Sequence, residues 1–151
     1  MVKQTYNVIL VSDIGNGTNT SGDTFFYDWT QIPDVPYNVR FSFISGVANL
    51  VNTQVATLFV DLTQPNNRIA MAQNGTNIVY RGGFIGSLMY SGTGANCFLF
   101  ADVNTNPPTF IKSRPRNNNF VVEIHQNIAS LAGDFVPVPG AYTLILSFEE
   151  C

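Results

Sequence analysis

The sequence predicts an all-β fold in which antiparallel strands pack as two sheets around one core. Apolar and polar residues alternate along most of the chain, which is the pattern of half-buried strands, whereas helical spacing is almost absent. Clusters of Gly, Pro and Asn separate these stretches at intervals of roughly 8–15 residues. The 151 residues suffice for one domain with its own core, and no linker, repeat or change of composition divides them.

The N-terminal half contains four stretches in which alternate residues are apolar. These residues are Tyr6, Val8 and Leu10, then Phe25, Tyr27 and Trp29, then Val39, Phe41 and Phe43, and last Ala56, Leu58, Val60 and Leu62. We predict a first strand over residues 4–12 and one strand for each later group, each group lying on one face of its strand. Residues 13–23 are predicted to form a loop, and Pro33 and Pro36 to bracket a turn. Residues 46–53 are the one segment where a helical turn is expected.

The C-terminal half opens with a hairpin signal. Asn74 and Gly75 lie between two apolar runs, and Asn-Gly in that setting is the strongest short-range indication of a β-hairpin. Two further strands are predicted over 84–90 and 98–103, followed by a turn at 104–108. The last two strands have the clearest alternation, in Phe120, Val122 and Ile124 and in Tyr142, Leu144, Leu146 and Phe148.

Strand count and chain length favour a single eight-stranded antiparallel jelly-roll sandwich over residues 1–151. The 12 phenylalanines, mostly at alternating positions, can fill the space between two sheets about 10 Å apart. An immunoglobulin-like sandwich is the rival, but the Cys…Trp…Cys spacing of true immunoglobulin domains is missing. Cys97 lies in an apolar run and is expected to be a small buried hydrophobe, whereas Cys151 is the last residue. Whether the two cysteines pair stays open.

The composition favours contact with other proteins and argues against nucleic acid. Charged residues make up 11% of the chain, the net charge is −3, and seven basic residues are too few for phosphate binding. A weakly charged surface costs little to desolvate. Because the chain shows neither a signal-peptide pattern nor a membrane-spanning run, we expect a protein made in the cytoplasm and not secreted. The glycosylation patterns at Asn16, Asn19 and Asn74 are then better explained as turn chemistry.

The sequence contains few residue patterns that would indicate catalysis or metal binding. His125 is the single histidine, which excludes a two-histidine metal site. Glu123 and His125 share one face of a predicted strand, where the simplest interpretation is a polar face opposite the apolar residues of that strand. Asp61 and Asp102 end separate strand patterns, so a glycosidase-like carboxylate pair has no support. We therefore expect no enzyme activity, no catalytic residue, no metal site and no cofactor.

Two groups of residues are candidates for contact with a partner or ligand. Lys112, Arg114 and Arg116 would suit an acidic partner surface or lipid headgroups, although a solvated loop is the simpler interpretation. Tyr27 and Trp29 would stack on a carbohydrate if they lay on an outer sheet face, although a place in the core is the simpler interpretation.

The C-terminal third carries a family resemblance. The segment Arg-Pro-Arg-Asn-Asn-Asn-Phe-Val-Val-Glu-Ile-His at 114–125, followed by Tyr-Thr-Leu-Ile-Leu-Ser-Phe-Glu at 142–149, is similar to the last strands of small capsid proteins. The family meant is the single jelly-roll minor capsid and penton proteins of large icosahedral double-stranded DNA viruses, such as the chlorella-virus group of the nucleocytoplasmic large DNA viruses.

The resemblance implies a structural virion protein, located in the capsid, without catalytic residues. Its partners would be the major capsid protein and sister subunits, in a homo-oligomer for which a pentamer at a five-fold vertex is favoured. Loops at one end would meet solvent or neighbours, and strand flanks would meet sister subunits. The alternative is a carbohydrate- or ligand-binding β-sandwich.

Overall fold

The computed structural model describes residues 2–12, 23–48, 55–62, 69–74, 77–91, 97–127, 136–137 and 141–151. Within them the chain forms twelve strands and one short 3-10 helix, η1 (Trp29–Gln31). The strands are β1 (Thr5–Ser12), β2 (Asp23–Phe26), β3 (Tyr37–Ala48), β4 (Val55–Val60), β5 (Ile69–Asn74), β6 (Asn77–Gly82), β7 (Phe84–Ser91), β8 (Cys97–Ala101), β9 (Thr109–Ile111), β10 (Asn119–Asn127), β11 (Val136–Pro137) and β12 (Tyr142–Glu150).

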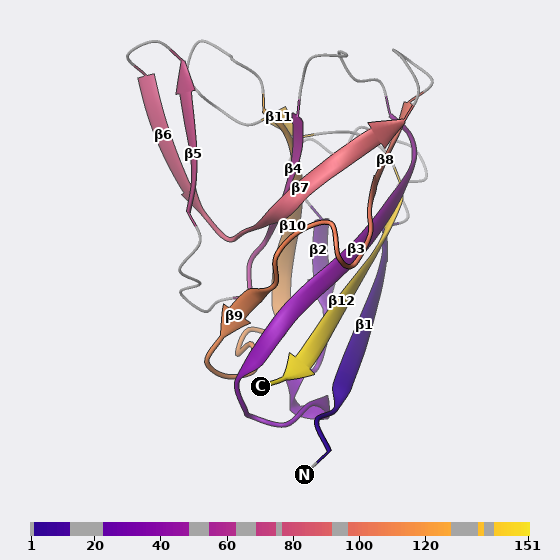
Figure 1. Ribbon diagram of the computed structural model, residues 1–151, viewed down its shortest axis with the longest axis vertical. Helices are drawn as coiled ribbons and strands as arrows, with labels where there is room; N and C mark the ends of the chain where they lie inside the picture. Colours follow the sequence, from indigo (N-terminus) through magenta and orange to yellow (C-terminus); the bar gives the residue numbers. More distant parts are fainter. Residues whose placement is uncertain are drawn as a thin grey trace.

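Ten strands form one sheet in the order β1-β12-β3-β8-β7-β4-β10-β11, with β2 also on β10 and β9 also on β3. Every described pair is antiparallel. The sheet folds back on itself, so that a front layer, β1-β12-β3-β8, covers a back layer, β2-β10-β4, and β7 crosses from β4 to β8 (Figure 1). The pair β7–β8 joins the layers at one flank, and β1 and β2 end them at the other. The predicted all-β antiparallel sandwich is confirmed.

Alternate side chains of the facing strands fill the space between the layers. In β12 the inward residues Tyr142, Leu144, Leu146 and Phe148 are buried, and the residues between them are partly exposed. The predicted inward faces of β3, β4 and β10 are buried in the same way. Burial of apolar side chains contributes roughly 25 cal/mol per Å², so these faces supply the main stabilisation of the fold.

The predicted second strand is wrong beyond Phe26. Asp28 caps η1 instead, because its Oδ1 accepts a hydrogen bond from the Thr30 amide at 3.0 Å. The helical turn swings Trp29 into the core, where its ring centroid lies 5.3 Å from those of Phe120 and Phe148. Phe120 belongs to the back layer and Phe148 to the front layer, so Trp29 packs against both.

Several other boundaries differ from the sequence prediction. Twelve strands are described where eight were expected, since β9 and β11 lie in segments for which no strand was predicted and β5 and β6 stand apart as the predicted hairpin. Residues 46–48 continue β3, and the rest of the predicted helical turn lies outside the described residues. The loop predicted at 13–23 ends one residue earlier, because Asp23 begins β2, and its residues 13–22, with Asn16 and Asn19, lie outside the described residues. The side chains of Asn74 and Cys97 also lie outside them. Cys151 is a free, exposed thiol.

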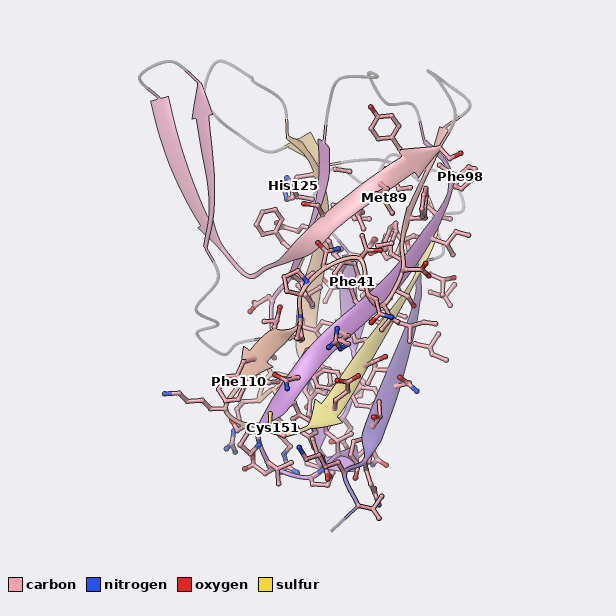
Figure 2. The ribbon with its side chains drawn as sticks, in the orientation of Figure 1. Phe41, Met89, Phe98, Phe110, His125 and Cys151 are labelled. Atoms are coloured by element: carbon pink, nitrogen blue, oxygen red, sulfur yellow. The ribbon has the colours of Figure 1, made fainter. Side chains whose placement is uncertain are left out.

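Strand β7 passes very close to two neighbouring side chains at Gly86. A Cβ added there would stand 2.5 Å from Phe41 Cε1 and 2.7 Å from Asn106 Cγ. Asn106 is held in place by two hydrogen bonds, from the Ser87 amide to Oδ1 at 3.0 Å and from Nδ2 to the Ser87 carbonyl at 2.9 Å. Phe41 lies centrally between the layers (Figure 2), so neither neighbour has room to withdraw.

We predict that Gly86→Ala lowers the free energy of unfolding by about 1–3 kcal/mol, the usual cost of overpacking a core. Gly82→Ala is the matched control, because Gly82 is a strand glycine with no atom within 4 Å of an added Cβ. The control is expected to be neutral or slightly stabilising. Urea unfolding of the two variants and the parent chain measures both values, and equal stabilities would contradict the packing described here.

Candidate interaction surface

Two residues of the predicted basic cluster, Arg114 and Arg116, bind the segment that follows η1. Arg114 Nη1 donates a hydrogen bond to the Ile32 carbonyl at 2.9 Å. Arg116 Nη2 lies 2.9 Å from Asp34 Oδ2 in an ion pair whose side chains are 61% and 38% exposed. Lys112 is exposed. Contact of these three residues with a partner stays a prediction, but two of their cationic groups already bind the segment around η1.

Tyr27 and Trp29, the aromatic pair proposed for ligand stacking, belong to the core or pack against it, and a place in the core was the simpler interpretation. Trp29 is 1% exposed, and its Nε1 donates to the Asn117 carbonyl at 2.9 Å. Tyr27 is half-buried and touches Trp29 edge to face, with ring centroids 4.8 Å apart. A ring that is 1% exposed offers no face to a sugar, so the structure does not support ligand stacking on Trp29.

We predict that Arg114→Met costs about 1–3 kcal/mol of stability, because a partly buried hydrogen bond from a charged donor is lost. Arg116→Met, the matched control, is expected to cost less than about 1 kcal/mol, because exposed ion pairs contribute little. Urea unfolding compares the two. A larger loss in Arg116→Met would contradict this assignment.

Glu123 and His125 form the predicted polar face of β10, and the structure adds that His125 is buried. The Nε2 atom of His125 lies 2.9 Å from Glu123 Oε2, and its ring meets Phe59 edge to face at 5.3 Å. His125 belongs to β10 and pairs with Thr57 of the neighbouring strand β4 (Figure 2). Asp61 follows β4 in the back layer and Asp102 follows β8 in the front layer. Among the described residues, no three His, Cys, Asp or Glu gather as metal ligands would.

Two buried tyrosine side chains donate hydrogen bonds through their hydroxyls. One bond links the two layers, and the other holds the turn at Pro33. The Tyr142 hydroxyl donates to Asp23 Oδ2 at 2.5 Å, which links β12 to β2. The Tyr37 hydroxyl donates to the Pro33 carbonyl at 2.6 Å. Burial raises the pKa of Tyr37 to about 12. Burial also raises the pKa of Tyr142 well above its usual value, and the hydrogen bond to Asp23 raises it further.

These raised pKa values predict a loss of stability in alkali. Up to about pH 10 the tyrosine side chains keep their phenolic protons in the folded and in the unfolded chain. Above that pH the unfolded chain releases protons that folded Tyr37 and Tyr142 retain, so the free energy of unfolding falls as pH rises through about 12. Phenolate absorbance should show the two groups ionising only as the chain unfolds, and Tyr142→Phe should flatten the fall. Complete tyrosine titration in the folded protein would contradict this.

The front layer has an apolar outer surface, which we call the apolar face. Its members are Ile9, Val11, Ile44, Met89, Phe98, Phe100 and Ile145. Five of them are strongly exposed, from 39% for Phe98 to 62% for Ile9. Cross-strand partners connect the set, since Ile9 pairs with Ile145 and Phe100 pairs with both Ile44 and Met89. Monomeric soluble proteins rarely leave a contiguous apolar surface of this kind uncovered.

The apolar face occupies one end of the front layer, and polar pairs occupy the other. At the polar end Arg40 Nε lies 3.3 Å from Glu149 Oε2, and the Ser147 hydroxyl donates to Asn7 Oδ1 at 2.7 Å. A groove of about 500 Å³ crosses the apolar end, between β12, β3 and β8. Met89 and Phe98 mark this end, and Phe110 marks the other (Figure 2).

The amino-acid sequence carries a signal for this face that the predictions above do not use. Strands β1 and β8 contain apolar residues in succession, at 8–11 and 97–101, so both of their faces are apolar. Only one of these faces can point into a two-layer core. The other face must then meet solvent or a partner.

Comparison with known proteins adds no relative: no family model matches the chain, and no curated protein or solved structure is significantly similar to it. Nor do the described segments contain a helix of the length and apolarity that crossing a membrane requires.

Proposed function

We propose that this chain is a structural protein that acts through protein–protein contacts, as a penton or minor capsid protein built from one jelly roll. The apolar face carries the proposal. Five of its residues are 39–62% exposed, and burying them against another protein would remove apolar surface from water, which is favourable.

The strand order supports the jelly-roll assignment. Along the chain β1, β2, β3 and β4 alternate between front and back layers, β7 follows β4 and crosses from it to β8, and β8, β10 and β12 alternate again. This order of strands is the one expected of a jelly roll, with β5–β6 inserted between β4 and β7. Jelly rolls form viral capsid domains and also lectin domains.

We propose a homo-oligomer for the assembled state, with a pentamer as the first expectation. A tapered single jelly roll suits a five-fold vertex, where the major capsid protein would flank it. A dimer or trimer would instead fit a minor capsid protein of the inner shell. The low charge favours either assembly, since 11% charged residues leave little charge to desolvate in an interface.

A ligand-binding sandwich is the second candidate, and the groove on the apolar face favours it. Its lining combines the rings of Phe98 and Phe100 with the carboxylate of Asp102. Apolar walls with few polar groups are typical of small-molecule sites. Chemical-shift changes at these residues on adding a panel of sugars would support this candidate over the first.

Light scattering of the purified protein over a range of concentrations tests the assembly proposal. We predict an oligomer whose dissociation constant rises at least tenfold in Phe98→Ser, equivalent to about 1.4 kcal/mol. Phe110→Ser is the matched control, because Phe110 is also an exposed strand phenylalanine but lies at the opposite end. A strict monomer, or equal effects of both substitutions, would contradict assembly through the apolar face.

A further inference from the structure

The edge of β1 is the feature that carries an inference beyond the proposed function. Among the described residues, β1 pairs with β12 alone, through an uninterrupted register from Thr5↔Glu149 to Ser12↔Tyr142. Within the part of the chain that the structure describes, its other edge therefore presents backbone N–H and C=O groups along eight residues. An unpaired edge of this kind is a template for another strand.

Strand β1 also lacks the usual protection of an edge. Proteins guard edge strands by charge, proline, a bulge or short length. Residues Thr5–Ser12 contain no charged residue and no proline, and their register with β12 shows no shift. The edge strands of the back layer, β2 and β11, do have such protection. β2 is four residues long and begins with Asp23, and β11 is two residues long and contains Pro137.

The position of β1 limits which partner can use its edge. β1 and β2 end the two layers at the same flank, and the β7–β8 pair closes the opposite flank. In a head-to-tail ring, each copy contacts the next through two different flanks. The β1 edge of one copy would then meet the β7–β8 flank of the next, which has no open strand edge. Two copies related by a two-fold axis instead bring β1 to β1. Because the strand is uncharged, identical copies meet there without like-charge repulsion.

We propose that two copies of this chain pair antiparallel through β1, which joins their front layers into one continuous sheet. This two-fold pairing corresponds to the dimer of a minor capsid protein and not to the contacts within a pentamer ring. Side chains opposite one another in a sheet lie on the same face, so outward residues must face outward residues. A two-fold axis at Leu10 sets Ile9 of each copy opposite Val11 of the other. These two side chains are 62% and 61% exposed in the single chain, and the pairing would make the two apolar faces contiguous.

Disulfide trapping tests the pairing, in a Cys151→Ser background that removes the exposed native thiol. Cα atoms of directly opposed strand residues lie about 4.5–5.5 Å apart, within the span of a disulfide. Mixing Ile9→Cys protein with Val11→Cys protein should give a cross-linked dimer under mild oxidation, whereas each variant alone should not. Thr5→Cys mixed with Val11→Cys is the matched control, and should remain uncross-linked. Cross-linking by Ile9→Cys alone would overturn the register.

Amide hydrogen exchange on the unsubstituted chain gives a second readout that needs no mutation. Protection of β1 amides should rise with protein concentration, and Val11→Lys should abolish the rise. Exchange independent of concentration, together with absent cross-links, would overturn strand pairing. The assembly proposal is separable, because an oligomer sensitive to Phe98→Ser without β1 protection would keep that proposal and reject this one.

Discussion

The packing of Trp29 between the two layers is the contact on which the rest of the structure depends. Its ring touches Phe120 of the back layer and Phe148 of the front layer at 5.3 Å each, and a third aromatic ring, Tyr27, closes one side. Buried aromatic pairs of this kind contribute about 0.5–1.5 kcal/mol beyond their burial. The hydrogen bond from Nε1 to the Asn117 carbonyl lets the indole enter the core without an unsatisfied donor.

This anchor also explains why the charged and polar loops around it are ordered. Asn118 accepts hydrogen bonds from the amides of Tyr27 and Trp29, through its carbonyl at 2.9 Å and its Oδ1 at 3.3 Å. Arg114 adds its bond to Ile32 on the other side of η1. These hydrogen bonds at the polar end of the sandwich are made within the chain. The opposite end of the front layer presents apolar side chains, which gain from a partner instead.

The sequence predicts the fold class and most inward faces because alternation is a local property. In β12, each second residue from Tyr142 to Phe148 is apolar and buried, as the pattern indicates. Strand order is not local: Thr5 pairs with Glu149 across almost the whole chain. Trp29 continues the alternation of Phe25 and Tyr27, and only the cap by Asp28 turns it out of the strand. Its burial was predicted as the simpler interpretation, but its route into the core was not.

The candidate surface was harder to predict than the core. Three cations within five residues stand out in a chain with few charges, yet Arg114 and Arg116 bind neighbouring loop atoms. The apolar face combines residues from β1, β3, β7, β8 and β12, which only the strand order brings together. The successive apolar residues of β1 and β8 indicate only part of it, because each strand contributes one or two members.

Hydroxyl-radical footprinting, at concentrations below and above assembly, tests most directly whether another protein covers the apolar face. The account predicts that Met89 and Phe98 are labelled in the dilute chain and protected in the assembled one, with Phe110 labelled equally in both. Equal labelling of Met89 and Phe98 in both states, or protection confined to Phe110, would contradict it.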